Sequence, residues 1–374
     1  MKKIMILAMT LCAALVATAT VRTVSSNPAT LGQFNTIQAA IDASNSGDTV
    51  YVYGSPNNYP SFTIADKVIT VIGPGWAPDK NLPLLAVVEG ASIRNSPAGG
   101  SPDGSELHGL LFTTTVIVSR NAVGGDFGTN NIRLVRCQFN GVVQWDLSSS
   151  GFLIEGCIFL NSINFSGSST YQNFLFQNNM FFLSVCCVSS QVNSLVNSVN
   201  VRFDHNLFSS SNNSGGATAS GFGGNSRFLT FTNNVFNQVN VGGNVSFSSF
   251  NNNITNNITL NSLNAAENGT PWAVNSNVDS GGNVANQSPL LSAQTSVNGG
   301  NANPLLDFTI ASGPANNSGS DGKDMGLLFD VSGSLNWTNS RNGRVPRIFS
   351  MNITTPSVAP GGTLSVTVDA RKSN

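Results

Sequence analysis

Charged residues are scarce in this chain. Lysine, arginine, aspartate and glutamate make up 9% of its 374 residues, against about 25% in ordinary soluble domains. The formal net charge is -1, so no electrostatic field draws the chain to nucleic acid or to an anionic membrane. We therefore expect no nucleic-acid partner.

Cysteine and histidine are also few. Five cysteines are too few for a disulfide scaffold in a chain of this length. The two histidines, His108 and His205, fall in different repeats of the pattern described below. About four coils, or roughly 20 Å, would separate them, so they cannot share a metal ion. The sequence predicts no metal site and no cofactor.

Long hydrophobic runs are confined to the N-terminus. Lys2 and Lys3 precede an apolar run, Ile4–Val16, and the small residues Ala17-Thr18-Ala19 follow it. This order is typical of a secretory signal peptide, here residues 1–19. The run is too short for a membrane span, and no later segment is long enough for one. We expect an exported protein, extracellular, at the cell surface or periplasmic, with a polar leader at residues 20–33.

Amide, glycine and phenylalanine residues are abundant instead. The chain holds 50 Asn, 37 Gly and 23 Phe, and 40% of its residues are hydrophobic. A disordered chain would lack this much apolar material to bury. The composition indicates a fold with many repeated hydrogen bonds.

One short pattern recurs every ~20–28 residues, the sign of a solenoid in which each repeat packs on its neighbours. An apolar strand leads to a small, thiol or amide residue, and a further apolar pair usually follows. The six copies are VRCQF (135–139), EGCIF (155–159), QNNMF (177–181), DHNLF (204–208), TNNVF (232–236) and NNNIT (251–255).

The central residue of each copy is expected to point inward at a corner and to form a ladder along the stack. A buried unpaired amide costs about 1–3 kcal/mol, so such residues are tolerable only when they bond to one another. For the first two positions, a disulfide and a pair of reduced thiols both fit the spacing of adjacent coils. The predicted ladder is Cys137, Cys157, Asn179, Asn206, Asn234 and Asn253.

Alternation divides each repeat into three short strands, as in a parallel β-helix. In the third strands, GVVQW (141–145), SINF (162–165), SVCC (184–187), QVNV (238–241) and NITL (257–260), apolar residues such as Trp145 should point inward. A column of phenylalanines, Phe139, Phe159, Phe181, Phe208 and Phe236, should stack on a neighbouring wall. The residues predicted to face outward are Gln144, Asn164, Cys186, Asn240 and Thr259.

Two segments near the start resemble the entry of pectin lyase-like right-handed β-helix proteins: IQAAIDASNSGDTVYV (37–52) and YPSFTIADKVITVIGPG (59–75). Ile37, Ala40 and Ile41 are spaced at i, i+3 and i+4, which predicts a short helix with one apolar face. The resemblance implies that this helix caps the first coil and so covers its strand edges. DGKDMGLLFD (321–330) resembles a sequence that closes bacterial chains of this kind. We predict an all-β fold, a right-handed parallel β-helix of about ten coils over residues 34–343. A strand pair at residues 344–374 should dock on it.

Enzymes of that superfamily place carboxylates and a basic residue on one outward face. Calcium-dependent lyases need several converging oxygen ligands, and hydrolases need two carboxylates. The outward set predicted above contains no carboxylate. The best catalytic candidates are Arg202, Asp204 and His205, beside the loop Ser209–Ser226. A surface ion pair beside a corner explains them as well and is the favoured interpretation.

Three hypotheses for function follow. The first is a non-catalytic, adhesin-like or polysaccharide-binding protein, whose binding face would hold Gln144, Asn164, Asn240 and Thr259. The second is an extracellular polysaccharide lyase or glycoside hydrolase. The third is a purely structural surface protein. This fold hosts many functions, so it does not choose among them, and the sequence leaves the oligomeric state open.

Overall fold

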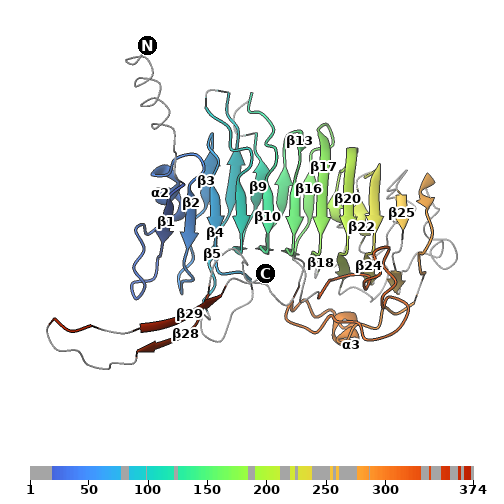
Figure 1. Cartoon of the computed structure of the whole chain (residues 1–374). Helices are drawn as coiled ribbons and strands as arrows, with labels where there is room; N and C mark the ends of the chain where they lie inside the picture. The colour runs from blue at the N-terminus through green and yellow to red at the C-terminus, as the bar shows by residue number, and fades with distance from the viewer. Residues whose placement is uncertain are drawn as a thin grey trace, which may run out of the picture.

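The computed structural model of the chain is a right-handed parallel β-helix (Figure 1). It describes residues 19–76, 84–97, 99–121, 125–183, 190–210, 220–223, 226–237, 253–255, 258–260, 276–285, 287–329, 337, 347–353, 361–363 and 366–371. Three parallel sheets, here named A, B and C, form the walls of the solenoid. The predicted fold class is confirmed.

In the middle of the stack, each coil contributes one strand to each sheet, and these strands pair in parallel with the strands of the next coil. Sheet A runs in spatial order through β1 (Val21–Val24), β2 (Thr49–Val52), β4 (Thr70–Ile72), β7 (Glu106–His108), β10 (Arg133–Val135), β14 (Leu153–Glu155), β17 (Thr170–Gln177), β20 (Asn197–Asp204), β23 (Leu229–Thr232), β25 (Asn253–Thr255) and β27 (Val278–Asp279), with β13 (Ser149–Ser150) beside β17. Sheet B runs through β5 (Val87–Val88), β8 (Leu111–Phe112), β11 (Gln138–Phe139), β15 (Ile158–Phe159), β18 (Met180–Leu183), β21 (Leu207–Ser210), β24 (Val235–Asn237) and β26 (Ile258–Leu260). Sheet C runs through β3 (Phe62–Ala65), β6 (Ala91–Arg94), β9 (Val116–Ser119), β12 (Val143–Trp145), β16 (Ile163–Phe165), β19 (Ser190–Asn193) and β22 (Ser220–Gly223).

A short helix covers the first coils, as the apolar spacing predicts. Helix α2 spans Ile37–Asp42, and its buried residues are Ile37, Ala40 and Ile41. The Thr36 side chain accepts a hydrogen bond from the Ala39 amide, which satisfies a helix N-terminus. The segment expected to be a leader instead begins the solenoid, because β1 pairs in parallel with β2.

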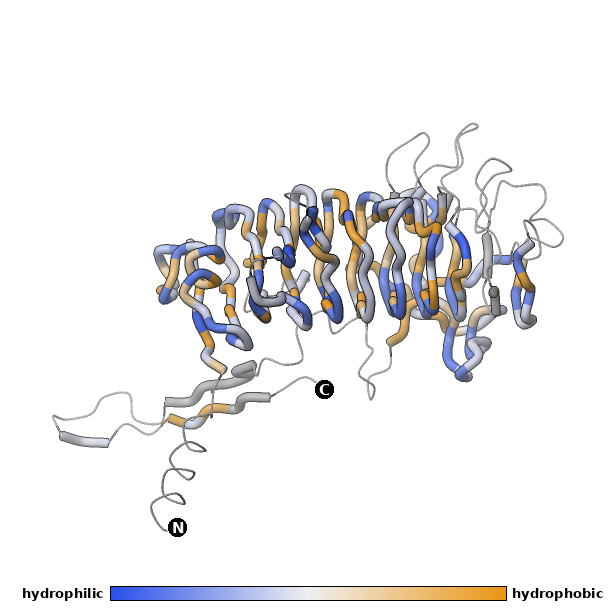
Figure 2. Tube along the Cα trace, turned by 90° about the horizontal axis from the view of Figure 1, so that it is seen from above, coloured by the Kyte–Doolittle hydropathy of each residue, from blue (hydrophilic) through white to orange (hydrophobic). Residues whose placement is uncertain are grey.

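Stacked phenylalanines fill the inside of sheet B. Successive ring centroids from Phe112 through Phe139, Phe159, Phe181 and Phe208 to Phe236 lie 5.3, 5.0, 4.9, 4.5 and 4.7 Å apart. The predicted column is confirmed. Figure 2 shows the alternation that produces it, with hydrophobic and hydrophilic residues exchanging along each coil. Parallel strands repeat at about 4.8 Å, so rings in register meet face to face.

The corner between sheets A and B has a fixed conformation. One residue there has a positive φ, as at Gly156 (63°), Asn178 (55°), His205 (53°) and Asn233 (59°). Glycine and asparagine adopt this conformation most readily. The next residue then points inward, into the ladder.

The asparagine ladder forms where it was predicted for three coils. The Asn206 carboxamide oxygen accepts from the backbone N–H and from Nδ2 of Asn179, at 2.9 and 3.0 Å. Asn234 accepts the same pair of bonds from Asn206, both at 2.9 Å. Each Nδ2 also donates to a strand carbonyl of the preceding coil.

Cys137 and Cys157 continue the ladder column as free, buried thiols. Cys157 Sγ lies 3.4 Å from the Leu134 carbonyl oxygen, and its backbone N–H donates to Asn179 Oδ1. Burial in the core raises the pKa of the Cys157 thiol well above its usual range.

We expect neither ladder thiol to react with iodoacetamide at pH ~8 in the folded protein, because both thiols are fully buried and inaccessible to the reagent. Mass spectrometry on a variant with Cys12, Cys186 and Cys187 replaced by serine would measure the labelling. Both thiols should label after unfolding in denaturant. Rapid labelling of the folded chain would contradict the burial of this column.

The sixth copy of the predicted repeat, NNNIT (251–255), is placed in the wrong register. Thr232 pairs with Thr255 and Val235 with Ile258. The ladder position of the next coil therefore falls at residue 257, outside the described residues, and Asn253 lies in sheet A opposite Thr230. The run NNNITNNIT contains two overlapping copies of the pattern, and the second copy is the one in register.

The third-strand predictions are correct for two coils and wrong for two others, and the fifth predicted strand, 238–241, lies outside the described residues. β12 and β16 lie where alternation places them. In sheet C, the strand next to β16 is β19 (Ser190–Asn193), and Val192 of β19 pairs with Ile163 of β16. The predicted strand 184–187 lies outside the described residues. Ile258–Leu260 pairs with β24 in sheet B and is no third strand.

A C-terminal segment, residues 287–329, here called the strap, runs along the outer face of sheet B (Figure 1). It includes helix α3 (Gln294–Asn298). Its apolar side chains, Leu291, Val297, Phe308, Ile310, Met325 and Leu327, pack on the outward row Ile158, Met180, Leu207 and Val235. The segment 321–330 was expected to close the end of the stack. Its described residues, 321–329, instead dock along the side of the solenoid.

Beyond the strap, β28 (Arg347–Ile353) and β29 (Val366–Arg371) form an antiparallel pair, as predicted. Figure 1 shows this pair beside the first coils, outside the stack. Its docking on the solenoid stays a prediction. Within the described residues, no helix has the length and apolar character needed to cross a membrane.

Candidate functional site

Sheet C presents the outer face that is best placed for a ligand. The strap covers the outer row of sheet B from Ile158 to Val235. On sheet C, one row runs in register along the stack. Its members are half-buried, apart from the buried Ser92, and all but Ile117 carry uncharged polar groups. The row is Thr63, Ser92, Ile117, Gln144, Asn164 and Asn193.

Hydrogen bonds along this row are made between neighbouring coils. The Thr63 and Ser92 hydroxyls lie 2.9 Å apart. Asn193 Nδ2 donates to Asn164 Oδ1 at 3.0 Å. These bonds orient the side chains and leave further donors and acceptors directed outward, since each amide can make several bonds.

Two shallow hollows lie on this row. One, of about 350 Å³, is lined by Gln144, Asp146, Asn164 and Ser166, with Trp145 and Phe165. The other, of about 240 Å³, lies nearer the N-terminus and is lined by Ser61, Phe62, Thr63, Ala91, Ser92, Thr115, Ile117 and Arg120. Ile117 is in register with Gln144 of the next coil, so the two hollows belong to one continuous face.

The floor of the larger hollow is rigid. Trp145 is fully buried and its ring stacks on Phe165 at 4.8 Å, which confirms the inward orientation predicted from alternation. The Tyr171 hydroxyl donates to the Trp145 carbonyl at 3.1 Å and accepts from the Ser166 amide at 2.9 Å. Burial raises the pKa of Tyr171 to about 12, so this hydroxyl keeps its proton at physiological pH.

The larger hollow contains one carboxylate, Asp146. The residues that the sequence predicted to face outward include no carboxylate. Asp146 Oδ1 accepts from Gln144 Nε2 at 2.6 Å, and its Oδ2 accepts from the Asn121 amide at 3.2 Å. Asp146 follows inward-facing Trp145, so the same alternation that oriented the indole also directs this carboxylate outward. Among the described residues that line the two hollows, it is the single carboxylate.

The predicted binding face is retained only in part. Gln144 and Asn164 are half-buried neighbours on sheet C, as expected. Asn193 takes the position that was assigned to Cys186. Thr259 lies in sheet B, in register with Phe236, and so does not belong to this face. Asn240 and Cys186 lie outside the described residues.

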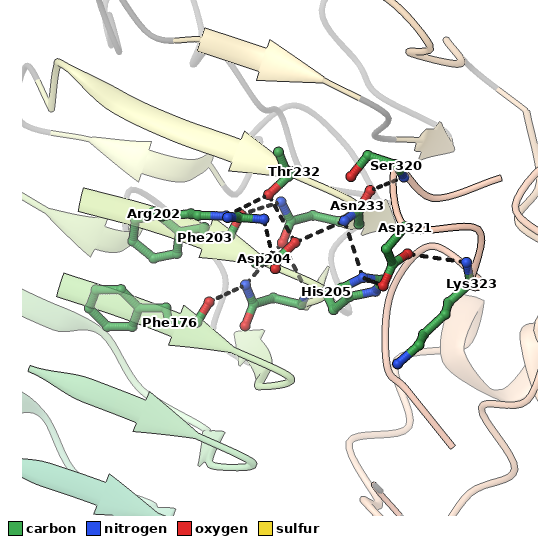
Figure 3. Close-up of polar contacts among 12 residues, drawn as sticks. Phe176, Arg202, Phe203, Asp204, His205, Thr232, Asn233, Ser320, Asp321 and Lys323 are labelled. Atoms are coloured by element: carbon green, nitrogen blue, oxygen red, sulfur yellow. Dashed lines mark hydrogen bonds and ion pairs between the residues drawn. The ribbon is translucent and has the colours of Figure 1, made fainter. Parts of the chain in front are cut away.

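Arg202, Asp204 and His205 are brought together at the corner of sheets A and B (Figure 3). Arg202 Nη2 donates to Asp204 Oδ2 at 3.0 Å, which confirms the predicted ion pair. The pair is less solvated than expected. Asp204 is 6% exposed, and its Oδ1 accepts from Thr232 Oγ1 and Asn233 Nδ2, both at 2.9 Å.

His205 is buried beneath the strap. Its Nδ1 lies 3.2 Å from the Gly326 carbonyl oxygen, and its Nε2 lies 3.1 Å from Asn233 Nδ2 and 3.3 Å from Asp321 Oδ2. The ring is 1% exposed. The sequence had placed this cluster beside the loop Ser209–Ser226. In the structure, the strap covers it through Gly326 and Asp321. Ser209 and Ser210 of that loop belong to β21, and residues 220–223 form β22. A ring enclosed in this way is placed to hold the strap and is poorly placed to meet a substrate.

A second charged group, which the sequence reasoning missed, lies on the outer face of sheet A. Glu106 Oε2 lies 2.6 Å from His108 Nε2, and Arg133 Nη1 lies 3.6 Å from Glu106 Oε1. The signal is the i, i+2 spacing of Glu106 and His108, which places both side chains on one face of a strand. His108 is 2% exposed, whereas the Arg133 side chain is 38% exposed, so this group is a partly buried polar network in which Arg133 and Glu106 join neighbouring coils.

No group of three or more histidine, cysteine, aspartate or glutamate side chains that could hold a metal ion occurs in the described part of the chain. Comparison with protein-family models finds none that matches this chain. Comparison with curated proteins likewise finds no similar sequence.

Proposed function

We propose that this protein is exported and binds extended polysaccharide along the outer face of sheet C without cleaving it. The observation that carries the proposal is the register-matched row of uncharged hydroxyl and amide groups across successive coils, from Thr63 to Asn193. Sugar hydroxyls are both donors and acceptors, and so are amides and hydroxyls. Ile117 adds an apolar contact for the carbon face of a sugar ring in the middle of the row.

The spacing of the row supports a linear ligand. Adjacent coils are about 4.8 Å apart, close to the length of one sugar residue in an extended chain. A chain that lies along the solenoid axis would therefore meet one polar side chain per sugar. A preformed and rigid face also lowers the entropic cost of binding such a ligand.

The alternative is a polysaccharide lyase or hydrolase that uses Asp146. A hydrolase of the usual kind needs two carboxylates flanking the scissile bond, and Asp146 has no second carboxylate among the described residues lining its hollow. We therefore place binding first. Released oligosaccharide in the experiment below would favour the enzyme.

The test is retention on a panel of plant, algal and bacterial polysaccharides, with product release followed in the same samples. Changing Gln144→Ala together with Asn164→Ala should weaken binding by roughly tenfold to a hundredfold, since each lost hydrogen bond contributes about 1 kcal/mol. The measurement is the dissociation constant on the polysaccharide that the unchanged protein retains best.

A matched control is the pair Gln138→Ala and Asn140→Ala. These amides bond to each other at 2.8 Å on the outer side of sheet B. Their removal should leave retention unchanged. Equal loss in both pairs would point to altered folding, and no loss in the first pair would remove sheet C from consideration.

A further inference from the structure

The strap is held to the solenoid by polar contacts from successive corner residues. Asn178 Oδ1 accepts from the Leu328 amide at 2.7 Å. Asn233 Oδ1 accepts from the Ser320 amide at 2.7 Å, and the Asn233 carbonyl accepts from the Gly326 amide at 2.7 Å. His205, between these two asparagines in the same column, is the one titratable member of the three.

The hydrogen bonds around His205 define two protonation states. Nδ1 faces the Gly326 carbonyl oxygen, an acceptor, so Nδ1 carries a proton in both states. The Asn233 amide orientation is fixed, because its Oδ1 accepts from Ser320 and its Nδ2 donates to Asp204. Asn233 Nδ2 therefore donates to Nε2 when the imidazole is neutral.

Protonation of Nε2 changes its hydrogen-bond partner from Asn233 to Asp321. The N–H then faces Asp321 Oδ2 at 3.3 Å and forms an ion pair with the strap. The bond from Asn233 Nδ2 to the ring is lost, but this amide still donates to Asp204. His205 would thus bond to the strap once when neutral and twice when charged.

We propose that His205 is a pH-sensitive latch that fastens the strap more tightly to the solenoid when its ring is protonated. The strap covers the apolar row Ile158, Met180, Leu207 and Val235. Weaker fastening at higher pH would therefore expose a hydrophobic face along sheet B. This inference is independent of the proposed polysaccharide binding.

The charges around the ring agree with this direction. On its own coil, Asp204 is balanced by Arg202. The next coil contributes Thr232 and Asn233, which are neutral, and the preceding coil contributes Asn178. Residues 321–324 of the strap contribute three charged groups near the ring: Asp321, which faces Nε2, Asp324, which bonds to Asn316 and Asn317, and Lys323, whose backbone amide donates to Asp321 Oδ1.

Hydrogen exchange of the strap amides measures the latch. Histidine is the side chain that changes charge between about pH 5 and 8. After correction for the intrinsic exchange rate, protection of the Gly326 and Leu328 amides should rise roughly tenfold from pH ~8 to pH ~5, because a charge-assisted bond is added. Unchanged or falling protection would overturn the proposal.

Two variants separate the latch from simple folding. Asp321→Asn removes the charged acceptor and should abolish the rise. His205→Asn should fold, because Asn178 and Asn233 adopt the same positive φ in this column, and it should fasten the strap equally at both pH values. A pH-dependent rise that survives in either variant would refute the assignment to His205.

Asp307→Asn is the control. Asp307 is an exposed carboxylate of the strap that accepts from the Thr309 side chain and backbone. These bonds hold the pKa of Asp307 below its usual range, so its charge is constant between about pH 5 and 8. This variant should keep the full rise in protection. Loss of the rise here would show that the effect depends on the total charge of the strap and not on the contact between Asp321 and His205, and it would overturn the latch.

Discussion

Replacing Phe203 by alanine is expected to destabilise the solenoid by about 3–5 kcal/mol. The ring is fully buried and lies between Phe176, at 4.4 Å, and Phe231, at 5.5 Å, along sheet A. It also contacts Phe222 of sheet C edge to face at 4.8 Å. The substitution would leave a cavity that contacts all three walls, and the phenylalanines around it are held by their own stacks.

Denaturant-induced unfolding followed by circular dichroism would measure this loss. Phe127→Ala is the matched control, because Phe127 is 57% exposed and its removal should cost less than about 1 kcal/mol. A loss below about 1 kcal/mol for Phe203→Ala would mean that this core is not close-packed.

The effect should also be local. In a solenoid each coil contacts its neighbours, so a weakened coil lowers the stability of the adjacent coils most. Hydrogen exchange should therefore accelerate in β17, β20 and β23 before it changes in β2 and β4. Uniform acceleration along the chain would indicate that the solenoid unfolds as one unit.

The sequence predicts the parts of this fold that repeat. Phenylalanine in register and an inward thiol or amide at the corner recur from coil to coil, so they appear in the sequence as a pattern. Helix α2 was predicted from its apolar spacing and ends at Asp42. Its three buried residues are the three that the spacing identified.

The wrong predictions fall where the repeat is interrupted. Between β15 and β16 the chain needs only a short connection, whereas between β18 and β19 a longer insertion moves the third strand to Ser190–Asn193. Alternation alone cannot locate a strand after an insertion of unknown length. The error at Asn253 has a different cause, since a run of asparagines fits the pattern in more than one register.

The sequence predicted the sheet C face better than the surroundings of His205, for a similar reason. Gln144 and Asn164 lie within regular coils, so their outward orientation followed from alternation. The environment of His205 depends on Asp321 and Gly326, which reach it through the strap. Lateral docking of a distant segment leaves no periodic signal, so the sequence indicated a surface ion pair where the structure has a buried contact.

The ladder supplies the second large effect: Asn206→Ala should cost about 3 kcal/mol or more. The change would remove the acceptor of two bonds from Asn179 and the donor to the Phe176 carbonyl and to Asn234 Oδ1. Each buried group left without a partner costs about 1–3 kcal/mol. Asn206 is fully buried, so water cannot replace these bonds.

Asn197→Ala is the control for this prediction. Asn197 lies in β20, the strand that precedes Asn206, but it is exposed, and its Nδ2 makes only long contacts, both 3.4 Å, with the Gly167 and Ser169 carbonyls. Its removal should cost less than about 1 kcal/mol by denaturant unfolding. Similar losses for the two variants would mean that the ladder contributes no more than a surface amide.

A further substitution would separate the two roles of Asn206. Asn206→Asp keeps an acceptor for the two bonds from Asn179 and removes the donor to Phe176 and Asn234. At neutral pH it places a carboxylate in the core beside acceptor oxygens, so it should destabilise at least as much as alanine. Lowering the pH should restore part of the stability, because a protonated carboxyl regains one donor. The ladder would then be established as a set of directional bonds, in which each coil fixes the corner of the next.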